Sequence, residues 1–222
     1  MTLGPRIWRF HRFPQETGYA QATQSGGFRG PRLGIDAVGQ FVSLVLEWEP
    51  GATAVGDFTL AFPRGVVVTE RVAVELSAQF EGITFGPVCF YEDPKLVRTK
   101  KIKVPQIRLP YVGPPLSYIY PEAEVPPNLS QSSFDIDEKN QKDGALGNLM
   151  GVERVEWVER RPKLVERIPG KGLFVDKHDV GGIDIFRVLD FPNWIFCADR
   201  VRRYVLDKGY TNVGFLEMGN VL

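Results

Sequence analysis

Residues 191–215, FPNWIFCADRVRRYVLDKGYTNVGF, predict a short buried strand that runs directly into a helix. The strand is expected over residues 194–197, and the helix near Asp199, because an acidic residue is favourable at the positive end of the helix dipole. Apolar side chains then recur at helical spacing: Val201, Tyr204 and Val205. Gly209 can adopt the left-handed conformation that ends a helix. A last strand over residues 213–218 would complete a strand–helix–strand unit.

A similar stretch occurs earlier in the chain. Residues 62–72 align with residues 191–201 without a gap, so that a Phe-Pro pair, three apolar residues and a final Arg-Val pair coincide. Downstream, residues 82–85 resemble residues 209–215 with a small shift. Two strand-to-helix units can look alike by chance, and the alternative is a real structural repeat. The repeat predicts two similar strand–helix–strand units in equivalent positions.

Composition is that of an ordinary globular protein. The chain has 222 residues, of which 43% are hydrophobic and 24% charged, and its net charge is zero. A neutral chain does not have the basic excess that non-specific nucleic-acid binding requires. No apolar run approaches the roughly 20 residues of a membrane span, and residues 1–12 contain no apolar secretion signal. We therefore expect a cytoplasmic protein with no nucleic-acid partner and no membrane association.

The predicted fold class is α/β, with α+β as the alternative, and with mixed sheets. Residues 1–93 are expected to form an N-terminal α/β half and residues 151–222 a C-terminal half, the latter including a charged hairpin. Between them, residues 94–150 form a proline-rich and charged connector. Eight prolines in residues 94–127 predict extended backbone or a sheet edge there, not a regular core element. The two halves could also form one compact domain. Strands in the first half are expected over residues 7–10, 41–48, 58–62 and 84–91.

Few side chains suggest catalysis. Cys89 and Cys197 lie in apolar strand-like contexts, which predicts two buried, unreactive thiols, and the chain offers no convincing metal or cofactor site. His178 has Asp176 and Asp179 beside it, which allows an enzyme that acts on a small substrate in a cleft near these residues. The simpler interpretation of the aspartates is that they cap a turn.

The C-terminal pattern also carries a family resemblance. Its elements are Asp184-Ile-Phe-Arg, Asp190-Phe191, Asp199-Arg-Val, Gly209 and Phe215-Leu-Glu. This pattern resembles the C-terminal end of bacterial immunity proteins, most closely the predicted immunity proteins with a double Cys-x-x-Cys-Gly motif. This chain has no Cys-x-x-Cys pair, so the resemblance implies no metal site. It implies a protein that binds and neutralises a cognate toxin without catalysing a reaction.

Two neighbouring segments are candidates for the toxin-binding surface. Residues 122–143 are predominantly acidic, and many toxins that act on nucleic acid are basic, so we expect Asp135, Asp137 and Glu138 to steer the encounter. A solvated loop would explain the same acidic residues. Tyrosines between the prolines could supply binding hot spots or could instead anchor the connector to the core: Tyr111, Tyr118 and Tyr120. The sequence leaves the oligomeric state open.

Overall fold

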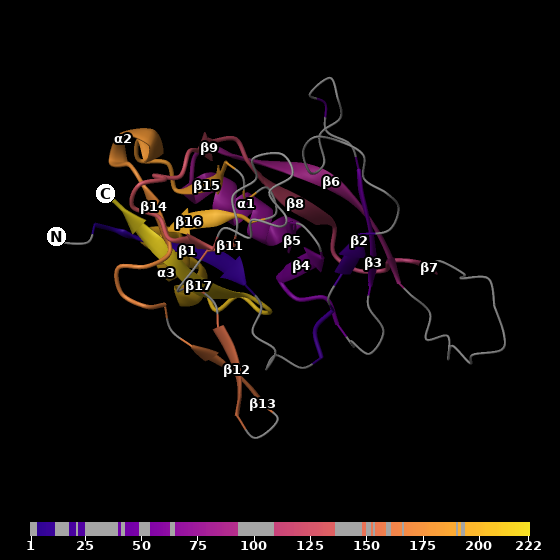
Figure 1. The fold of residues 1–222 in the computed structure, drawn as a ribbon. Helices are drawn as coiled ribbons and strands as arrows, with labels where there is room; N and C mark the ends of the chain where they lie inside the picture. Colours follow the sequence, from indigo (N-terminus) through magenta and orange to yellow (C-terminus); the bar gives the residue numbers. More distant parts are fainter. Residues whose placement is uncertain are drawn as a thin grey trace.

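The computed structural model contains two large mixed β-sheets, two small two-stranded sheets and three helices within the residues that it describes (Figure 1). These residues are 4–11, 18–20, 22–24, 40, 43–48, 54–62, 65–92, 109–135, 148–149, 152, 154–158, 161–165, 167–189, 191 and 194–222. The architecture confirms the expected class, an α/β or α+β fold with mixed sheets. The helices are α1 (Glu70–Gln79), α2 (Lys177–Val180) and α3 (Asp199–Asp207).

The strands follow in chain order. Those of the first half of the chain are β1 (Arg6–His11), β2 (Ala22–Gln24), β3 (Leu44–Trp48), β4 (Phe58–Phe62), β5 (Val66–Thr69), β6 (Ile83–Glu92) and β7 (Leu109–Pro110). Those of the second half are β8 (Leu116–Pro121), β9 (Glu124–Val125), β10 (Phe134–Asp135), β11 (Asn148–Leu149), β12 (Arg154–Val158), β13 (Arg161–Val165), β14 (Leu173–Val175), β15 (Ile185–Val188), β16 (Phe196–Ala198) and β17 (Gly214–Val221). Strands β12 and β13 form the expected hairpin, which extends away from the two large sheets (Figure 1).

The six-stranded sheet has the order β14-β17-β1-β16-β15-β9. Strand β1 lies between β16 and β17 and is antiparallel to both. Strands β14 and β9 form the two edges and pair in parallel with β17 and β15. The N-terminal strand therefore completes a sheet whose other strands all come from residues 124–221.

The seven-stranded sheet has the order β3-β2-β4-β5-β8-β6-β7, and β3 also pairs in parallel with β6. This pairing closes all its strands except β7 into a ring, which makes a small barrel. Strand β6 continues without a break through Gly86-Pro87, although a proline removes a donor from the strand ladder. Glycine is required at position 86 because the ring of Tyr118 occupies the space that a Cβ atom would fill.

Both predicted strand–helix–strand units are present, as β5–α1–β6 and β16–α3–β17. Helix α1 begins directly after β5 at Glu70, and α3 begins directly after β16 at Asp199. These two residues coincide in the ungapped alignment. Gly209 ends the second helix as predicted, with a left-handed φ of 65° and its N–H donating to the carbonyl of Leu206 at 3.0 Å. The structure thus confirms two similar units.

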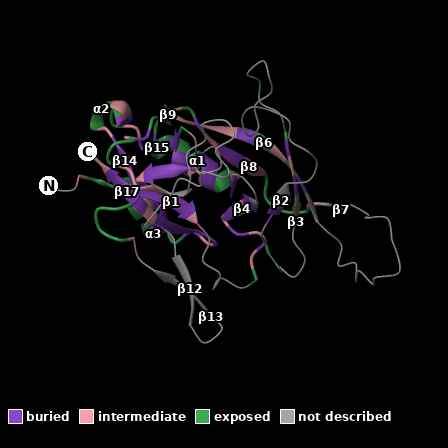
Figure 2. Cartoon of the chain, in the orientation of Figure 1, coloured by how far each residue is buried: buried purple, intermediate pink, exposed green. Residues whose placement is uncertain are grey.

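Three apolar clusters form the core (Figure 2). The first joins both large sheets to α1 and α3, the second covers the opposite face of the six-stranded sheet, and the third fills the barrel. Residues 195–197 are buried as predicted, together with Val201 and Val205 of α3. Trp194 is half-buried and packs against the second cluster.

The prediction that residues 94–127 contain no regular core element is wrong for strand β8. This strand pairs with β5 on one side and β6 on the other, and Tyr118 and Ile119 are buried. Prolines flank the strand, but Pro114 and Pro115 precede it and Pro121 ends it, so its ladder keeps its donors. Strand β8 therefore lies inside the sheet built from the N-terminal part of the chain, just as β1 lies inside the C-terminal sheet.

The prediction for the two thiols is half right. Cys197 is fully buried, and burial raises the pKa of its thiol well above the ordinary value. Cys89 is exposed. Alternation along β6 explains the difference, because Phe90 points into the barrel and its neighbour must point to the other face.

Candidate functional site

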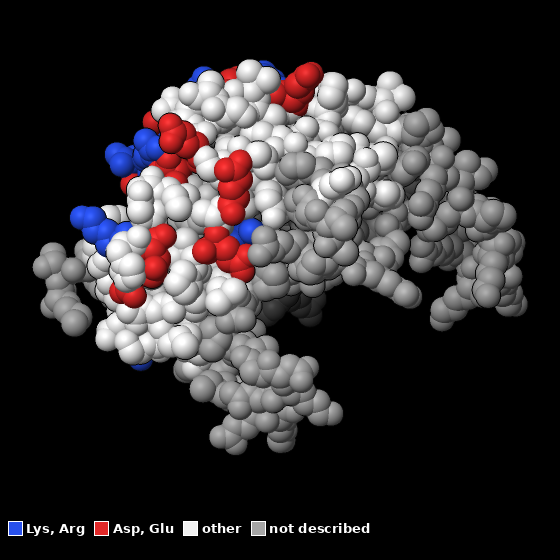
Figure 3. All heavy atoms as spheres, turned by 90° about the horizontal axis from the view of Figure 1, so that it is seen from above, with Lys and Arg blue, Asp and Glu red and all other residues white. Residues whose placement is uncertain are grey.

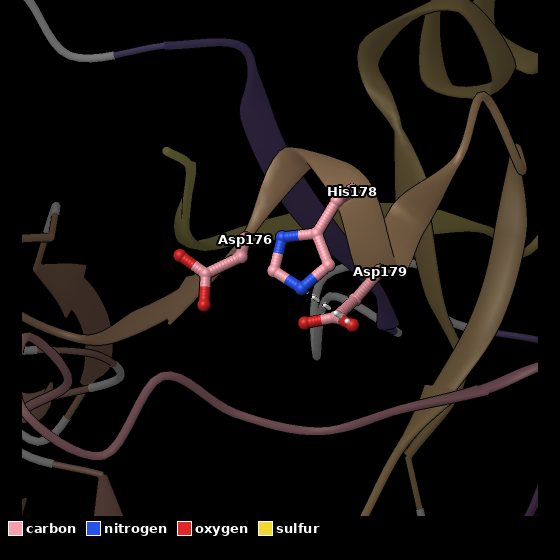
Figure 4. A group of neighbouring side chains, drawn as sticks. All are labelled: Asp176, His178 and Asp179. Atoms are coloured by element: carbon pink, nitrogen blue, oxygen red, sulfur yellow. Dashed lines mark ion pairs between the residues drawn. The ribbon is translucent and has the colours of Figure 1, made fainter.

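The residues of the predicted enzyme site lie together at the start of α2. Asp176 precedes the helix, and His178 and Asp179 belong to its single turn, with possible ligand atoms all within 4.8 Å of one another. The His178 Nε2 atom lies 3.1 Å from Asp179 Oδ1, and the histidine side chain is 78% exposed. In Figure 4 the Asp179 carboxylate faces the imidazole Nε2, and the Asp176 carboxylate lies off an adjacent side of the ring. The histidine therefore lies on the surface, not in a cleft.

Asp176 has a structural partner. Asn128 Nδ2 donates to both carboxylate oxygens of Asp176, at 2.9 and 3.1 Å, and the Asn128 N–H donates to the carbonyl of Phe174 at 2.8 Å. These bonds attach residues 126–133 to the end of β14. Asp176 occupies the N-cap position of α2, but its side chain makes no capping hydrogen bond there, so the turn-capping interpretation is not confirmed for this aspartate. A tetrahedral zinc ion would need ligand atoms roughly 3.3 Å apart, so the three side chains would have to move together to bind one. What remains is an exposed imidazole–carboxylate pair.

The three candidate tyrosines do not form one surface. Tyr118 lies inside the barrel with no exposed area, and burial raises the pKa of its phenol to about 12. Its side chain cannot contact a partner of the folded protein, so its assignment to the binding surface is corrected. Tyr111 is half-buried and packs edge-on against Phe90, with ring centroids 5.2 Å apart. For these two tyrosines the structure favours the alternative of anchoring the chain to the core.

Tyr120 is half-buried beneath a cation. The guanidinium of Arg187 lies 5.0 Å from its ring centroid. Arg187 is itself buried, donates to the carbonyl of Pro121 at 3.3 Å and lies 3.4 Å from a carboxylate oxygen of Glu124. This arrangement holds β9 against β15 and leaves the tyrosine only partly accessible.

Residues 136–143 of the acidic segment lie outside the described residues, including Asp137 and Glu138. The structure describes residues 122–135, of which Asp135 belongs to β10 and pairs with Asn148. On the face seen from above, the described acidic side chains appear in several separate groups, some with basic side chains beside them (Figure 3). The described surface in this view therefore shows no single acidic patch that could replace the predicted segment.

An aromatic stack includes Phe134 of the acidic segment. Phe134 stacks on Phe191 with ring centroids 6.0 Å apart, and Phe191 stacks on Trp194 at 5.3 Å, both pairs being nearly parallel. The guanidinium of Arg9, which belongs to β1, lies 4.4 Å from the centroid of the Trp194 ring. We call these four side chains the aromatic stack. Phe134 and Trp194 keep part of their surface exposed, whereas Phe191 and Arg9 are buried.

Sequence reasoning missed the stack because its members come from three distant segments. The local signal in the sequence is the pair Phe191 and Trp194, which by itself predicts only a buried strand that begins at residue 194. A turn places the two rings together, with the Trp194 N–H donating to the carbonyl of Phe191 at 3.2 Å. Phe134 and Arg9 join them only through tertiary contacts.

The residues that carry the immunity-protein resemblance hold the C-terminal unit together. Asp184, just before β15, is buried and forms a two-bonded ion pair with Arg200 in the first turn of α3. Its carbonyl accepts a hydrogen bond from the Ala198 N–H at 2.8 Å. The hydrogen bonds with Asp184 raise the pKa of the Arg200 guanidinium. The two halves of the motif, Asp-Ile-Phe-Arg and Asp-Arg-Val, are therefore joined directly.

No protein-family model matches the chain, and no curated protein matches its sequence. Among the described residues, no helix is both long and apolar enough to span a bilayer.

Proposed function

We propose that this chain is an immunity protein that binds and neutralises a cognate bacterial toxin by protein–protein contact in the cytoplasm. The observation that carries the proposal is the direct pairing of Asp184 with Arg200, which joins the two parts of the motif that resembles immunity proteins. What the chain has in common with those proteins is thus a scaffold element, on which binding segments are placed. The proposal rests on that resemblance and needs no catalytic group.

The aromatic stack and the acidic segment 122–143, to which Phe134 belongs, are the proposed contact surface. Aromatic and arginine side chains supply a large share of the binding energy at protein interfaces, and Trp194 and Phe134 are both partly exposed. Asp135 directly follows Phe134 in β10, so an acidic residue is the chain neighbour of the stack. Residues 122–143 contain six acidic and two lysine side chains, which would attract a basic toxin and speed the encounter. Tyr118 is not part of this surface.

The first experiment is purification with the product of the neighbouring open reading frame. An equimolar complex and protection of cells that express that product are expected. Trp194→Ala should weaken binding about 30-fold, which corresponds to a hot-spot loss of about 2 kcal/mol. Val74→Ala is the matched control, because Val74 is 64% exposed on α1, away from the stack. Equal binding by both variants, with unchanged circular dichroism, would exclude the stack as the contact surface.

A second experiment distinguishes an effect of the acidic segment on association from an effect of net charge alone. Reversing Asp135, Asp137 and Glu138 to lysine should slow association with the toxin at low salt and weaken protection. The matched control reverses three exposed acidic residues elsewhere, which gives the same change in net charge: Glu70, Glu81 and Asp207. If the two triple variants associate at the same rate, the segment does not steer the encounter.

The alternative proposal is an enzyme that uses His178 with Asp176 and Asp179. The observation in its favour is the closeness of these three side chains. His178→Ala separates the two proposals, because it should abolish turnover of a small substrate but leave toxin neutralisation unchanged. Loss of neutralisation in this variant, with toxin binding also lost, would instead place the start of α2 in the toxin interface.

A further inference from the structure

The two large sheets have the same strand order and the same strand directions. Read from one edge, the six-stranded sheet is β14-β17-β1-β16-β15-β9, and the barrel is β3-β6-β8-β5-β4-β2. The first pair and the last pair in each are parallel, and the three pairs between them are antiparallel. Each strand of one sheet therefore has a counterpart in the other.

The chain order of these counterparts is also the same. Residues 6–92 supply β1, β2, β3, β4, β5, α1 and β6, and residues 116–221 supply β8, β9, β14, β15, β16, α3 and β17 in the matching sequence. Only the first member of each series is out of place. Strand β1 lies in the sheet of the second series, and β8 lies in the sheet of the first.

Register supports the equivalence. In the barrel, Val68 of β5 lies opposite Phe58 and Ser117. In the six-stranded sheet, Cys197 of β16 lies opposite Ile185 and Trp8. The ungapped sequence alignment already places position 68 over position 197. Ser117 and Trp8 are thus equivalent, although one comes from the middle of the chain and the other from its N-terminus.

An ion pair is repeated as well. Asp57, just before β4, accepts a hydrogen bond from Arg71 in the first turn of α1 at 2.6 Å, as Asp184 does from Arg200. In both units the aspartate carbonyl also accepts the N–H of the last strand residue before the helix, from Thr69 at 3.1 Å in the first unit.

Contacts between the units are reciprocal. The guanidinium of Arg71 lies 5.3 Å from the ring centroid of Tyr210, in the turn after α3, and that of Arg200 lies 5.4 Å from the ring of Phe80, which directly follows α1. Each helix thus presents its arginine to an aromatic residue in the segment that follows the other helix. Reciprocal contacts of this kind define a two-fold interface between like subunits.

We infer that the chain consists of two tandem repeats that have exchanged their first strands, so that each sheet is a binding site for the first strand of the other repeat. The arrangement is that of a strand-swapped dimer contained in one polypeptide. In this arrangement each half of the chain completes the sheet of the other half. Without β1, the strands β16 and β17 lose their shared partner, and Ile7, Trp8 and Phe10 leave the core.

Disulfide trapping in the full-length protein tests the exchange. The parent variant carries Cys89→Ser and a specific protease site between Lys100 and Lys101, and it is cleaved only after folding and purification. The test variant carries Val68→Cys and Ser117→Cys in addition to these changes. It is folded, purified, cleaved and then oxidised with oxidised glutathione. Because Val68 and Ser117 are paired residues of β5 and β8, a disulfide should join the two fragments until a reductant is added.

The matched control carries Ser117→Cys alone and keeps the native Cys197. Without strand exchange, position 117 would take the place of Trp8 opposite Cys197, and oxidation would form a disulfide inside the C-terminal fragment. Exchange predicts no such bond. A bond between position 117 and Cys197, with the two fragments not joined in the first variant, would overturn the inference.

A second pair guards against a folding defect from Val68→Cys. Pro87 is exposed on β6 and is the partner of Ser117 across the β6–β8 ladder. Pro87→Cys with Ser117→Cys should also join the two fragments. If neither this pair nor the first joins them while circular dichroism shows a folded protein, β8 is not held in the N-terminal sheet and the inference fails.

Discussion

Truncation of Phe196 to alanine tests the structure of the second apolar cluster. Phe196 is completely buried in β16, and its ring centroid lies 6.1 Å from those of both Phe186 and Trp194. Removing a buried phenylalanine side chain costs about 3–5 kcal/mol, because transfer free energy is lost and a cavity remains. Two aromatic contacts disappear with it, so we expect the upper part of that range.

The assay is urea unfolding followed by circular dichroism, with thermal unfolding as a second measure. A loss of about 4 kcal/mol should lower the melting temperature by roughly 8–16 °C in a chain of this size. Leu206→Ala is the control, because Leu206 is 45% exposed on α3 and should change stability by less than about 1 kcal/mol. A loss below about 1 kcal/mol for Phe196→Ala would refute its burial between β1 and β15.

Two further predictions concern single interactions. Asp184→Asn should lower the free energy of unfolding by about 1–2 kcal/mol, which is the low end for a charged hydrogen-bonded pair because the Arg200 side chain is 56% exposed. Urea unfolding measures this loss. The repeat predicts that Asp57→Asn, measured in the same way, is also destabilised. Tyr118 has a pKa raised to about 12 by burial, so its contribution to stability is complete below pH 10, the ordinary phenol value, and is lost as the pH rises towards 12. Absorbance titration at alkaline pH should show a late phenol ionisation that Tyr118→Phe removes, and an unchanged titration curve would contradict the buried position.

The strand–helix–strand units were predictable because their signals are local. The apolar run before Asp199, the helical spacing after it and the glycine at position 209 lie within one short stretch, and each acts through neighbours in the chain. The ungapped match between residues 62–72 and 191–201 has the same origin. Both units form as the alignment predicts, down to the first residue of each helix.

The contact surface and the enzyme site were predictable only as a set of residue types. Sequence placed His178 beside two aspartates correctly, but not the exposure of the imidazole or the hydrogen bonds from Asn128 to Asp176. It assigned Tyr118 to a surface that the barrel closes. The aromatic stack was not predicted, because Arg9 contacts Trp194, and Phe134 contacts Phe191, from segments far away in the sequence.

The sequence by itself determined where the chain can form strands and helices, since dihedral preferences, helix ends and apolar periodicity act over a few residues. Only the tertiary structure decided which strands pair. The backbone N–H and C=O groups of strand β1 could form hydrogen bonds with any strand of compatible length. Its actual partners, β16 and β17, lie about two hundred residues away in the sequence. That choice depends on which apolar faces are buried together, and pairing energies of this kind are not written in any local pattern.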